Sequence, residues 1–316
     1  MIESSSQPGR HDHLLSPQFL RKLEQAAIAS KHILVGRTKG ERRSARRGSS
    51  VEFADFRAYN PGDDLRYLDW NAFARLQRLF LKLFIEEEDL HVYMLIDASR
   101  SMDFGSPPHD RRASPSKLRW GQQAAAALSY IALCGGDRVQ AFAHSGADGA
   151  SSRLFRGRGA APELFDWLAG QGAAGETGLV QAVRWLRAAA PAPGLTFLIS
   201  DLLTPEWETA LSQLAVTKGE ACVLHVLTPD EFSPGARGDL RLIDSETIGQ
   251  EQAPAQQCEV TMGASLLRRY TQERDRFLAD VRATCNRYGF SYLFSLTDQP
   301  VEDVILKSLR KLQVIR

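Results

Sequence analysis

The chain has 316 residues, of which 43% are hydrophobic, and it carries a formal net charge of +1. This length allows one large domain or two modest ones with a substantial apolar core. The near-neutral charge points to no partner through overall electrostatics, and no apolar run approaches the roughly 20 residues that a membrane-spanning helix needs. These features argue against a membrane span. They do not identify a function, which must be inferred from local motifs.

The first 35 residues are predicted to form a polar tail and one amphipathic helix. Residues 1–16 lack the apolar core of a secretory signal peptide. Between residues 17 and 34 the apolar side chains recur at helical spacing. The cysteines have no C-x-x-C spacing, so we expect reduced, packed thiols in a cytoplasmic protein. They are Cys134, Cys222, Cys258 and Cys285.

Residues 36–48, GRTKGERRSARRG, are rich in lysine and arginine. A run of this kind is compatible with contacts to phosphate or nucleic acid. No aromatic side chain is interleaved with the basic ones, so we interpret the run as a solvated loop or one that pairs with acidic groups.

Residues 36–90 as a whole are predicted to form an arm that packs on the rest of the chain. A turn is expected at residues 60–64, NPGDD, because proline and glycine force a reversal there. A short helix or turn is expected near residues 70–76, and a strand over residues 79–85.

The charged residues of this arm allow two interpretations. Acids and arginines alternate between residues 57 and 75 beside aromatic side chains, which predicts a buried ion-pair network that holds the arm in place. Asp63 and Asp64 could instead form a catalytic acid–base pair, although tandem acids after Pro-Gly are ordinary turn chemistry.

The stretch that follows, HVYMLIDASRSM at residues 91–102, carries the first candidate site. Its apolar run predicts a strand buried on both faces of a parallel sheet. The strand ends at Asp97, and Ser99 and Ser101 follow in the pattern D-x-S-x-S. One carboxylate and two hydroxyls from a short turn are oxygen ligands of the kind that suit Mg²⁺.

A second strand end carries further oxygen ligands. Residues 195–199 form another apolar run that closes on Asp201, and Thr177 lies on a glycine-flanked loop before a predicted helix. Because parallel strands end at one edge of a sheet, where open α/β sheets bind ligands, we expect these groups to lie near Asp97. The simpler alternative is that Asp97 and the serines only cap the following turn and helix.

From residue 116 onward, helical and strand patterns alternate, which predicts a doubly wound α/β fold with a mostly parallel sheet covered on both faces. A small insertion at about residues 229–263 interrupts the alternation before the last strand, with strands expected at 240–243 and 259–262. The other expected strands are 139–143, 153–155, 221–227 and 290–294, and the expected helices are 116–134, 162–168, 179–190, 205–216, 264–288 and 301–312.

The pattern DASRS, with Thr177 and Ser200-Asp201, resembles the metal-ion-dependent adhesion site of von Willebrand factor A domains. The resemblance implies that Ser99, Ser101 and Thr177 ligate Mg²⁺ directly, and that Asp97 and Asp201 act mostly through water. It also implies an open coordination position that accepts a carboxylate from a partner protein.

A second resemblance covers about residues 47–201. Gly48, Glu52-Phe53, Arg57-Ala58-Tyr59, PGDDLR, Leu68-Asp69-Trp70, Ala74-Arg75, Lys82 and Glu86 precede DASRSM. This series resembles the bacterial family called domain of unknown function fifty-eight, whose members join such a segment to a von Willebrand A-like domain and are typically encoded beside MoxR-type AAA+ ATPases. The resemblance implies a tail and helix at 1–35, an arm at 36–90 and a von Willebrand A-like domain at 91–316.

We therefore predict a non-catalytic, Mg²⁺-dependent protein-interaction module whose partner is a MoxR-type AAA+ ATPase or its protein client. One alternative is a metal-dependent phosphate-ester hydrolase, although Ser99 occupies the position of the second acid in the D-x-D motif of such enzymes. The other alternative is nucleic-acid binding through residues 36–48.

Overall fold

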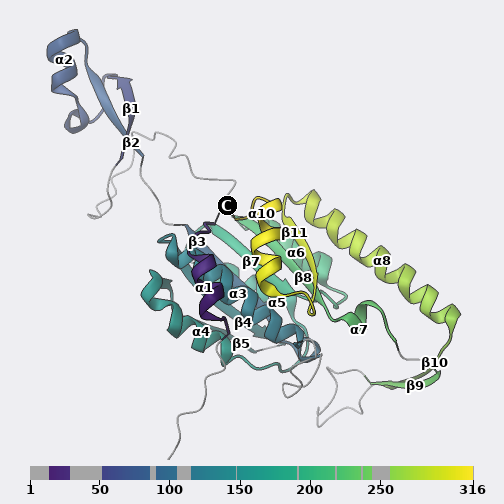
Figure 1. The fold of residues 1–316 in the computed structure, drawn as a ribbon. Coiled ribbons are helices and arrows are strands. Elements are labelled where there is room, and N and C mark those ends of the chain that lie inside the picture. The colour runs from purple at the N-terminus through teal and green to yellow at the C-terminus, as the bar shows by residue number, and fades with distance from the viewer. Residues whose placement is uncertain are drawn as a thin grey trace, which may run out of the picture. The chain divides into compact units, whose positions relative to one another are not determined.

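The computed structural model describes residues 14–28, 52–85, 90–104, 115–146, 148–190, 192–217, 219–235, 238–243 and 257–315. It separates into two compact units (Figure 1). The main unit comprises residues 1–30 and 90–316, and the small unit comprises residues 31–89. The basic run at residues 36–48 lies outside the described residues.

A seven-stranded sheet forms the centre of the main unit, in the order β11-β8-β7-β3-β4-β5, with β6 paired to β4. Strands β11, β8, β7, β3 and β4 are parallel, whereas β5 and β6 run antiparallel to β4. The strands are β3 (His91–Asp97), β4 (Arg138–Ser145), β5 (Asp148–Ser151), β6 (Phe155–Arg156), β7 (Gly194–Ser200), β8 (Glu220–Leu227) and β11 (Ser291–Leu296). The predicted mostly parallel α/β sheet is confirmed.

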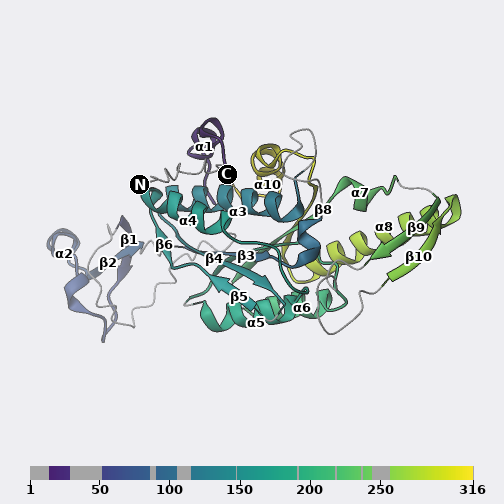
Figure 2. The same ribbon diagram turned by 90° about the horizontal axis from the view of Figure 1, so that it is seen from below.

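Helices cover both faces of this sheet, and each layer encloses its own apolar cluster (Figure 2). One layer holds α1 (Pro17–Leu23), α3 (Lys117–Cys134), α4 (Ala161–Ala169), α9 (Val301–Asp303) and α10 (Leu309–Lys311). The other holds α5 (Leu179–Ala189), α6 (Trp207–Ala215) and the C-terminal part of α8 (Ala264–Arg287). Helices on both faces are the arrangement that parallel connections require.

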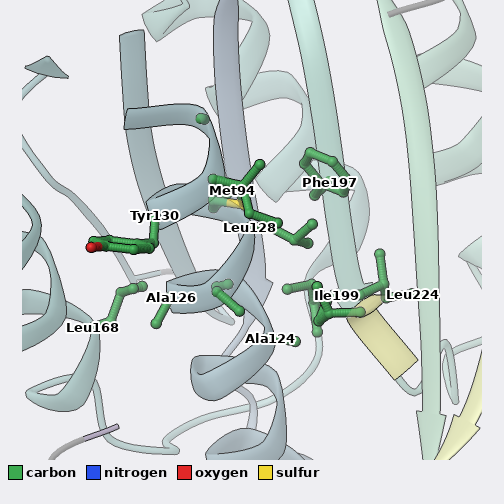
Figure 3. Packing of buried hydrophobic residues seen from close by; sticks show 14 of the residues in the cluster. Met94, Ala124, Ala126, Leu128, Tyr130, Leu168, Phe197, Ile199 and Leu224 are labelled. Carbon is green, nitrogen blue, oxygen red and sulfur yellow. The ribbon is translucent and has the colours of Figure 1, made fainter. Parts of the chain in front are cut away.

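Helix α3 is the best-buried helix because small side chains let it approach the sheet closely. Residues 124–127 are four alanines, all without exposed surface. Figure 3 shows Leu128 of α3 beside Met94 of β3 and Phe197 of β7. The helix is capped by Ser116, whose hydroxyl accepts a hydrogen bond from Arg119 N at 3.3 Å. Its position directly over β3 and β7 brings its N-terminus to the edge where these strands end.

The insertion before the last strand forms an arm of the main unit. Strands β9 (Gly238–Ile243) and β10 (Gln257–Met262) pair antiparallel, which confirms the predicted excursion. Helix α7 (Pro229–Phe232) precedes the hairpin and α8 follows it. Figure 2 shows the hairpin at the N-terminal end of α8, away from the sheet. In α8 the buried residues are Val281, Thr284 and Cys285, all in its C-terminal part.

The small unit consists of the antiparallel pair β1 (Glu52–Ala58) and β2 (Phe80–Ile85), a 3-10 turn at Leu65–Tyr67 and helix α2 (Trp70–Leu76). The predicted buried ion-pair network is wrong here. Arg66 pairs with Asp64 in a contact that is largely solvent-exposed. Arg57 pairs with Asp63, six residues away. The charges pair within one local turn because partners close in sequence meet without any need for burial.

Three smaller predictions are also wrong. Helix α1 ends at Leu23 rather than continuing to residue 34, and Ile28 forms an isolated β-bridge with Ile315 instead. The strand expected at residues 153–155 is replaced by β6, which begins at Phe155. All four cysteines are free thiols, as expected, but Cys258 is exposed because it lies on the projecting hairpin.

Candidate metal centre at the ends of β3 and β7

The edge where β3 and β7 end is the point at which the chain connections diverge. From β3 the chain passes through α3 to β4 on one side, and later returns to β7 on the other side of β3. In open α/β sheets the crevice at such a divergence is the usual ligand-binding position. Asp97 and Ser200 are the last residues of these two strands, so their side chains meet at this edge.

Asp97 is held by both neighbouring strand ends. Its Oδ1 accepts a hydrogen bond from Ser99 N at 3.0 Å, and its Oδ2 accepts one from the Ser200 hydroxyl at 2.7 Å. The side chain is 3% exposed. Burial, and then the nearby charge of Asp201, raises the pKa of Asp97 to about 6. Its ionised form is therefore costly in the absence of a cation.

Two serine hydroxyls follow in the turn after β3. The Oγ atoms of Ser99 and Ser101 lie 3.0 Å apart, with Ser99 fully buried and Ser101 half-buried. The turn continues as a short 3-10 helix from Arg100 to Asp103. Because Asp97 binds the backbone N–H of Ser99, the carboxylate orients the turn that carries both hydroxyls.

The loop that carries Thr177 is hydrogen-bonded to the same turn. Ala174 N donates to Ala98 O at 2.8 Å, and Arg100 N donates to Gly175 O at 3.1 Å. Gly175 has a φ of 63°, which a glycine adopts without strain. Thr177 is half-buried two residues further on. These contacts bring the third predicted loop to the edge that holds Asp97.

Asp201 follows β7 and is fully buried. Its Oδ1 accepts a hydrogen bond from Leu203 N at 3.0 Å. Between them Leu202 has a φ of 56°, a left-handed conformation that is unfavourable for a leucine, and it is itself fully buried. Asp97, Ser99, Ser101 and Asp201 thus follow the ends of β3 and β7, and the loop that carries Thr177 is bonded to the turn after β3. Which of the five residues would ligate a metal stays a prediction.

The sequence reasoning missed two charged residues at this edge, Lys117 and Glu231. Lys117 has no exposed side-chain surface, and its Nζ lies 2.6 Å from Asp201 Oδ2 and 2.5 Å from Glu231 Oε1. Burial alone would lower the pKa of Lys117, but the charges of Asp201 and Glu231 outweigh burial and raise it. Lys117 is therefore a buried cation beside the candidate site.

One sequence signal could have identified Lys117. It occupies the first position of α3, where the helix macrodipole disfavours a positive charge. Its neighbours Leu118 and Trp120 belong to the apolar face. A lysine at that position needs a buried carboxylate, and Asp201 provides one. Glu231 carries no comparable signal, because a glutamate three residues after Thr228 is the ordinary pattern of a capping box.

The charge balance at this edge fits a divalent cation. Asp201 and Glu231 share one ammonium group, Lys117, and Asp97 lies near Asp201, so when all three carboxylates are ionised two formal negative charges remain among these four residues. Within the described part of the chain, no three His, Cys, Asp or Glu side chains gather as a metal-binding group. The serine and threonine hydroxyls would therefore have to complete the ligand set, and hard oxygen donors of this kind match Mg²⁺.

Sequence relatives of the chain include two mycobacterial proteins. The uncharacterized protein Mb1516 of Mycobacterium bovis is 29% identical over 235 residues, which cover 73% of this chain and 72% of the relative. The uncharacterized protein Rv1480 of Mycobacterium tuberculosis matches to the same extent.

Solved structures that align with the chain include the conserved hypothetical protein BatB of Bacteroides thetaiotaomicron. The alignment covers 71% of this chain and 98% of BatB, with 14% sequence identity and a TM-score of 0.39. Among the helices that the structure describes, none combines the length and the apolar character needed to cross a bilayer. The family described as "Protein of unknown function DUF58" matches residues 55–273, and the chain belongs to this family.

Proposed function

We propose that the chain is a non-catalytic, Mg²⁺-dependent protein-interaction module of the von Willebrand factor A type. In this proposal Ser99, Ser101 and Thr177 hold the cation, while Asp97 and Asp201 orient the hydroxyls from behind them. Neutral hydroxyl ligands leave most of the ionic charge available, so the cation attracts a carboxylate from a partner protein. Mg²⁺ would supply a polarising positive charge at the surface, and the chain would supply its position.

The observation that carries this proposal is the convergence of three loops on buried negative charge that Lys117 compensates only in part. The turn after β3 carries two hydroxyls and is bonded to the buried Asp97, Asp97 lies near the buried Asp201, and the loop of Thr177 is bonded to the same turn. Caps alone would satisfy backbone N–H groups without placing Asp97 and Asp201 close enough for one to raise the pKa of the other. A cation at this edge removes that repulsion.

A nucleophilic role for Asp97 is less well supported than a positioning role. Both of its oxygens already accept hydrogen bonds, from Ser99 N and from the Ser200 hydroxyl. A carboxylate held on both oxygens and 3% exposed is poorly placed to attack a phosphate ester. The proposal therefore assigns binding rather than catalysis to this edge.

The partner proposed is a MoxR-type AAA+ ATPase encoded beside the gene, or the protein client of that ATPase. This part rests on the family resemblance: members of the family are typically encoded next to such ATPases. Assembly or remodelling of a protein complex is the process in which a metal-dependent adaptor of this kind would take part.

Metal binding is tested first, by titrating Mg²⁺ into the full chain and following the heat and the melting temperature. We expect the wild type to bind Mg²⁺ and Ser99→Ala to bind at least about tenfold more weakly, because a direct ligand is lost. Ser212→Ala is the matched control, since that hydroxyl only bonds Thr209 O in α6. Equal binding by wild type and Ser99→Ala would remove Ser99 from the site.

Partner binding is tested by a pull-down with the ATPase encoded beside the gene, in Mg²⁺ and in EDTA. We expect capture in Mg²⁺ that is lost in EDTA and in Asp97→Ala. Capture that is indifferent to both changes would remove the metal from the mechanism.

A further inference from the structure

Lys117 connects the candidate metal centre to a part of the chain far from it in sequence. Its ammonium group lies between Asp201, at the end of β7, and Glu231, in helix α7. The two partners are 84 and 114 residues away along the chain. Since Lys117 is fully buried, water screens its positive charge little. A change in the charge or position of one carboxylate therefore changes the interaction of Lys117 with the other.

Glu231 in turn fixes the start of the insertion arm, by which we mean α7, the β9–β10 hairpin and the N-terminal half of α8. Its Oε2 accepts hydrogen bonds from Thr228 N at 2.8 Å and from the Thr228 hydroxyl at 3.1 Å, which completes the capping box of α7. One carboxylate therefore serves both the lysine and the helix cap. Displacing Glu231 would loosen the cap and the lysine together.

Helix α7 is joined to α8 by contacts at Glu231 and the next residue, Phe232. The Tyr270 hydroxyl donates to Glu231 O, and the Arg274 guanidinium donates to Phe232 O. The Arg274 Cζ atom also lies 4.0 Å from the centre of the Phe232 ring. Among the described residues of α8, none before Val281 is buried. The contacts to Glu231 and Phe232 are thus important anchors for the N-terminal half of α8 and the hairpin before it.

Given the Mg²⁺ site of the proposed function, on which this inference rests, we propose that Lys117 couples cation binding to the seating of the arm. The coupled path runs from Asp201 through Lys117 and Glu231 to α7, and from there to Tyr270 and Arg274 of α8. Cation binding and the attachment of residues 228–235 and 264–276 then stabilise one another.

The direction of the coupling follows from the charges. The Glu231 carboxylate adds negative potential at the site and shares the Lys117 ammonium group with Asp201, so that Lys117 does not neutralise Asp201 alone, and both effects favour a divalent cation. By thermodynamic reciprocity, the bound cation must strengthen the hold on Glu231 to the same degree. The arm is therefore expected to be more firmly seated when Mg²⁺ is bound.

The test compares two acids that are adjacent in α7. Glu231→Gln removes the charge that faces Lys117 and keeps an oxygen for the cap. Asp230→Asn removes the same charge one residue earlier, on the exposed side of the helix. For the full-length wild type and both variants, Mg²⁺ affinity is measured by calorimetry, and amide hydrogen exchange is followed with and without Mg²⁺ by mass spectrometry.

We expect the Mg²⁺ dissociation constant to rise roughly three- to tenfold in Glu231→Gln and by less than about twofold in Asp230→Asn, because one buried charge is lost only in the first. Mg²⁺ should slow amide exchange in residues 228–235 and 264–276 of the wild type and of Asp230→Asn. In Glu231→Gln this slowing should disappear.

Tyr270→Phe keeps the test decisive if Glu231→Gln does not fold. This variant leaves every charge in place and removes only the bond from α8 to Glu231 O. Mg²⁺ affinity should stay within about twofold of the wild type, since the charges at the site are unchanged. The Mg²⁺-dependent slowing should persist in residues 228–235 and be weaker than in the wild type in residues 264–276, where the Arg274 contacts to Phe232 remain.

The outcomes separate this inference from the proposed function. If the wild type and Glu231→Gln bind Mg²⁺ equally, or if Mg²⁺ leaves exchange in residues 228–235 of the wild type unchanged, the coupling is refuted while the metal site stands. If the wild type binds no Mg²⁺, the metal site and the coupling are both refuted.

Discussion

The two units each place an aspartate in a turn, and the two aspartates behave in opposite ways. In the small unit, the N–H of Asn60 donates to Asp63 at 2.8 Å and Arg57 lies beside it, and these contacts lower the pKa of Asp63. In the main unit, burial and the neighbouring Asp201 raise the pKa of Asp97 to about 6. Both side chains accept local hydrogen bonds, so bonding alone does not explain the difference.

The comparison shows that burial, rather than the presence of an acid in a turn, distinguishes the candidate site. The two ion pairs at the 60–64 turn join residues close in sequence and are reached by solvent. Their charges are therefore already balanced, and each pair contributes little to stability. At the ends of β3 and β7 the carboxylates are removed from water and outnumber their cation. Only the second arrangement holds buried negative charge that an added divalent ion would compensate.

The largest effect that would sharpen this comparison is expected for Lys117→Met. The change leaves Asp201 and Glu231 buried without their cation, which should lower the free energy of unfolding by about 3–5 kcal/mol. The measurement is urea unfolding of the main unit in EDTA. The matched change in the small unit is Arg66→Met, which removes the cation beside Asp64. We expect the urea midpoint of the small unit to stay unchanged in this variant. Comparable losses in both variants would contradict the distinction drawn from burial.

A smaller loss is expected for Leu202→Gly at the edge of the site. Leu202 is fully buried with a φ of 56°, so glycine relieves backbone strain but removes a packed side chain. The net cost should be about 2 kcal/mol, since the loss of packing exceeds the strain. Leu202→Ala loses less volume but keeps the strain, and we expect it to be no more stable than Leu202→Gly. A markedly more stable alanine variant would show that the strain at Leu202 is negligible.

Asp97→Asn should raise the free energy of unfolding in EDTA, whereas the two preceding variants lower it. A folded-state pKa raised to about 6 means that folding takes up a proton at acidic pH, so the stability of the wild type in EDTA falls as the pH rises toward that value. At pH 7 in EDTA, the neutral variant should be more stable than the wild type by on the order of 1–2 kcal/mol.

The wild type and Asp97→Asn also test whether Mg²⁺ binds through the charge of Asp97. Mg²⁺ should raise the melting temperature of the wild type at pH 7 and leave Asp97→Asn unchanged, because the variant lacks the charge that the ion compensates. An Asp97→Asn variant that is both less stable in EDTA and still stabilised by Mg²⁺ would contradict the role given to Asp97.

The smallest effect is expected for Gln77→Gly in the small unit. Gln77 caps α2 with a φ of 53°, close to the φ of Leu202, but it is exposed. Glycine should therefore stabilise α2 by about 0.5–1 kcal/mol, measured by amide exchange across residues 70–76. Ala74→Gly, inside the same helix, is the control and should destabilise it by a similar amount. A loss at Gln77 would mean that its side chain contributes more than its exposure indicates.

Much of the candidate site could be predicted from the sequence because it depends on local patterns. The apolar runs before Asp97 and Asp201 specify buried parallel strands, and parallel strands end at one edge of a sheet. Where the pattern was weak, as after Leu23 in α1, the boundary was missed because a tertiary contact of Ile28 with Ile315 replaced the helix.

Only the tertiary structure decided how the charges are balanced. The sequence contains Lys117 and Glu231, but nothing local assigns them to Asp201, because their contacts span 84 and 114 residues. Whether such a group is paired and how far its pKa shifts depend on burial and on distances summed over the whole fold. Short-range periodicity therefore determined where the candidate oxygen ligands lie, and long-range packing determined the charge that a cation would meet there.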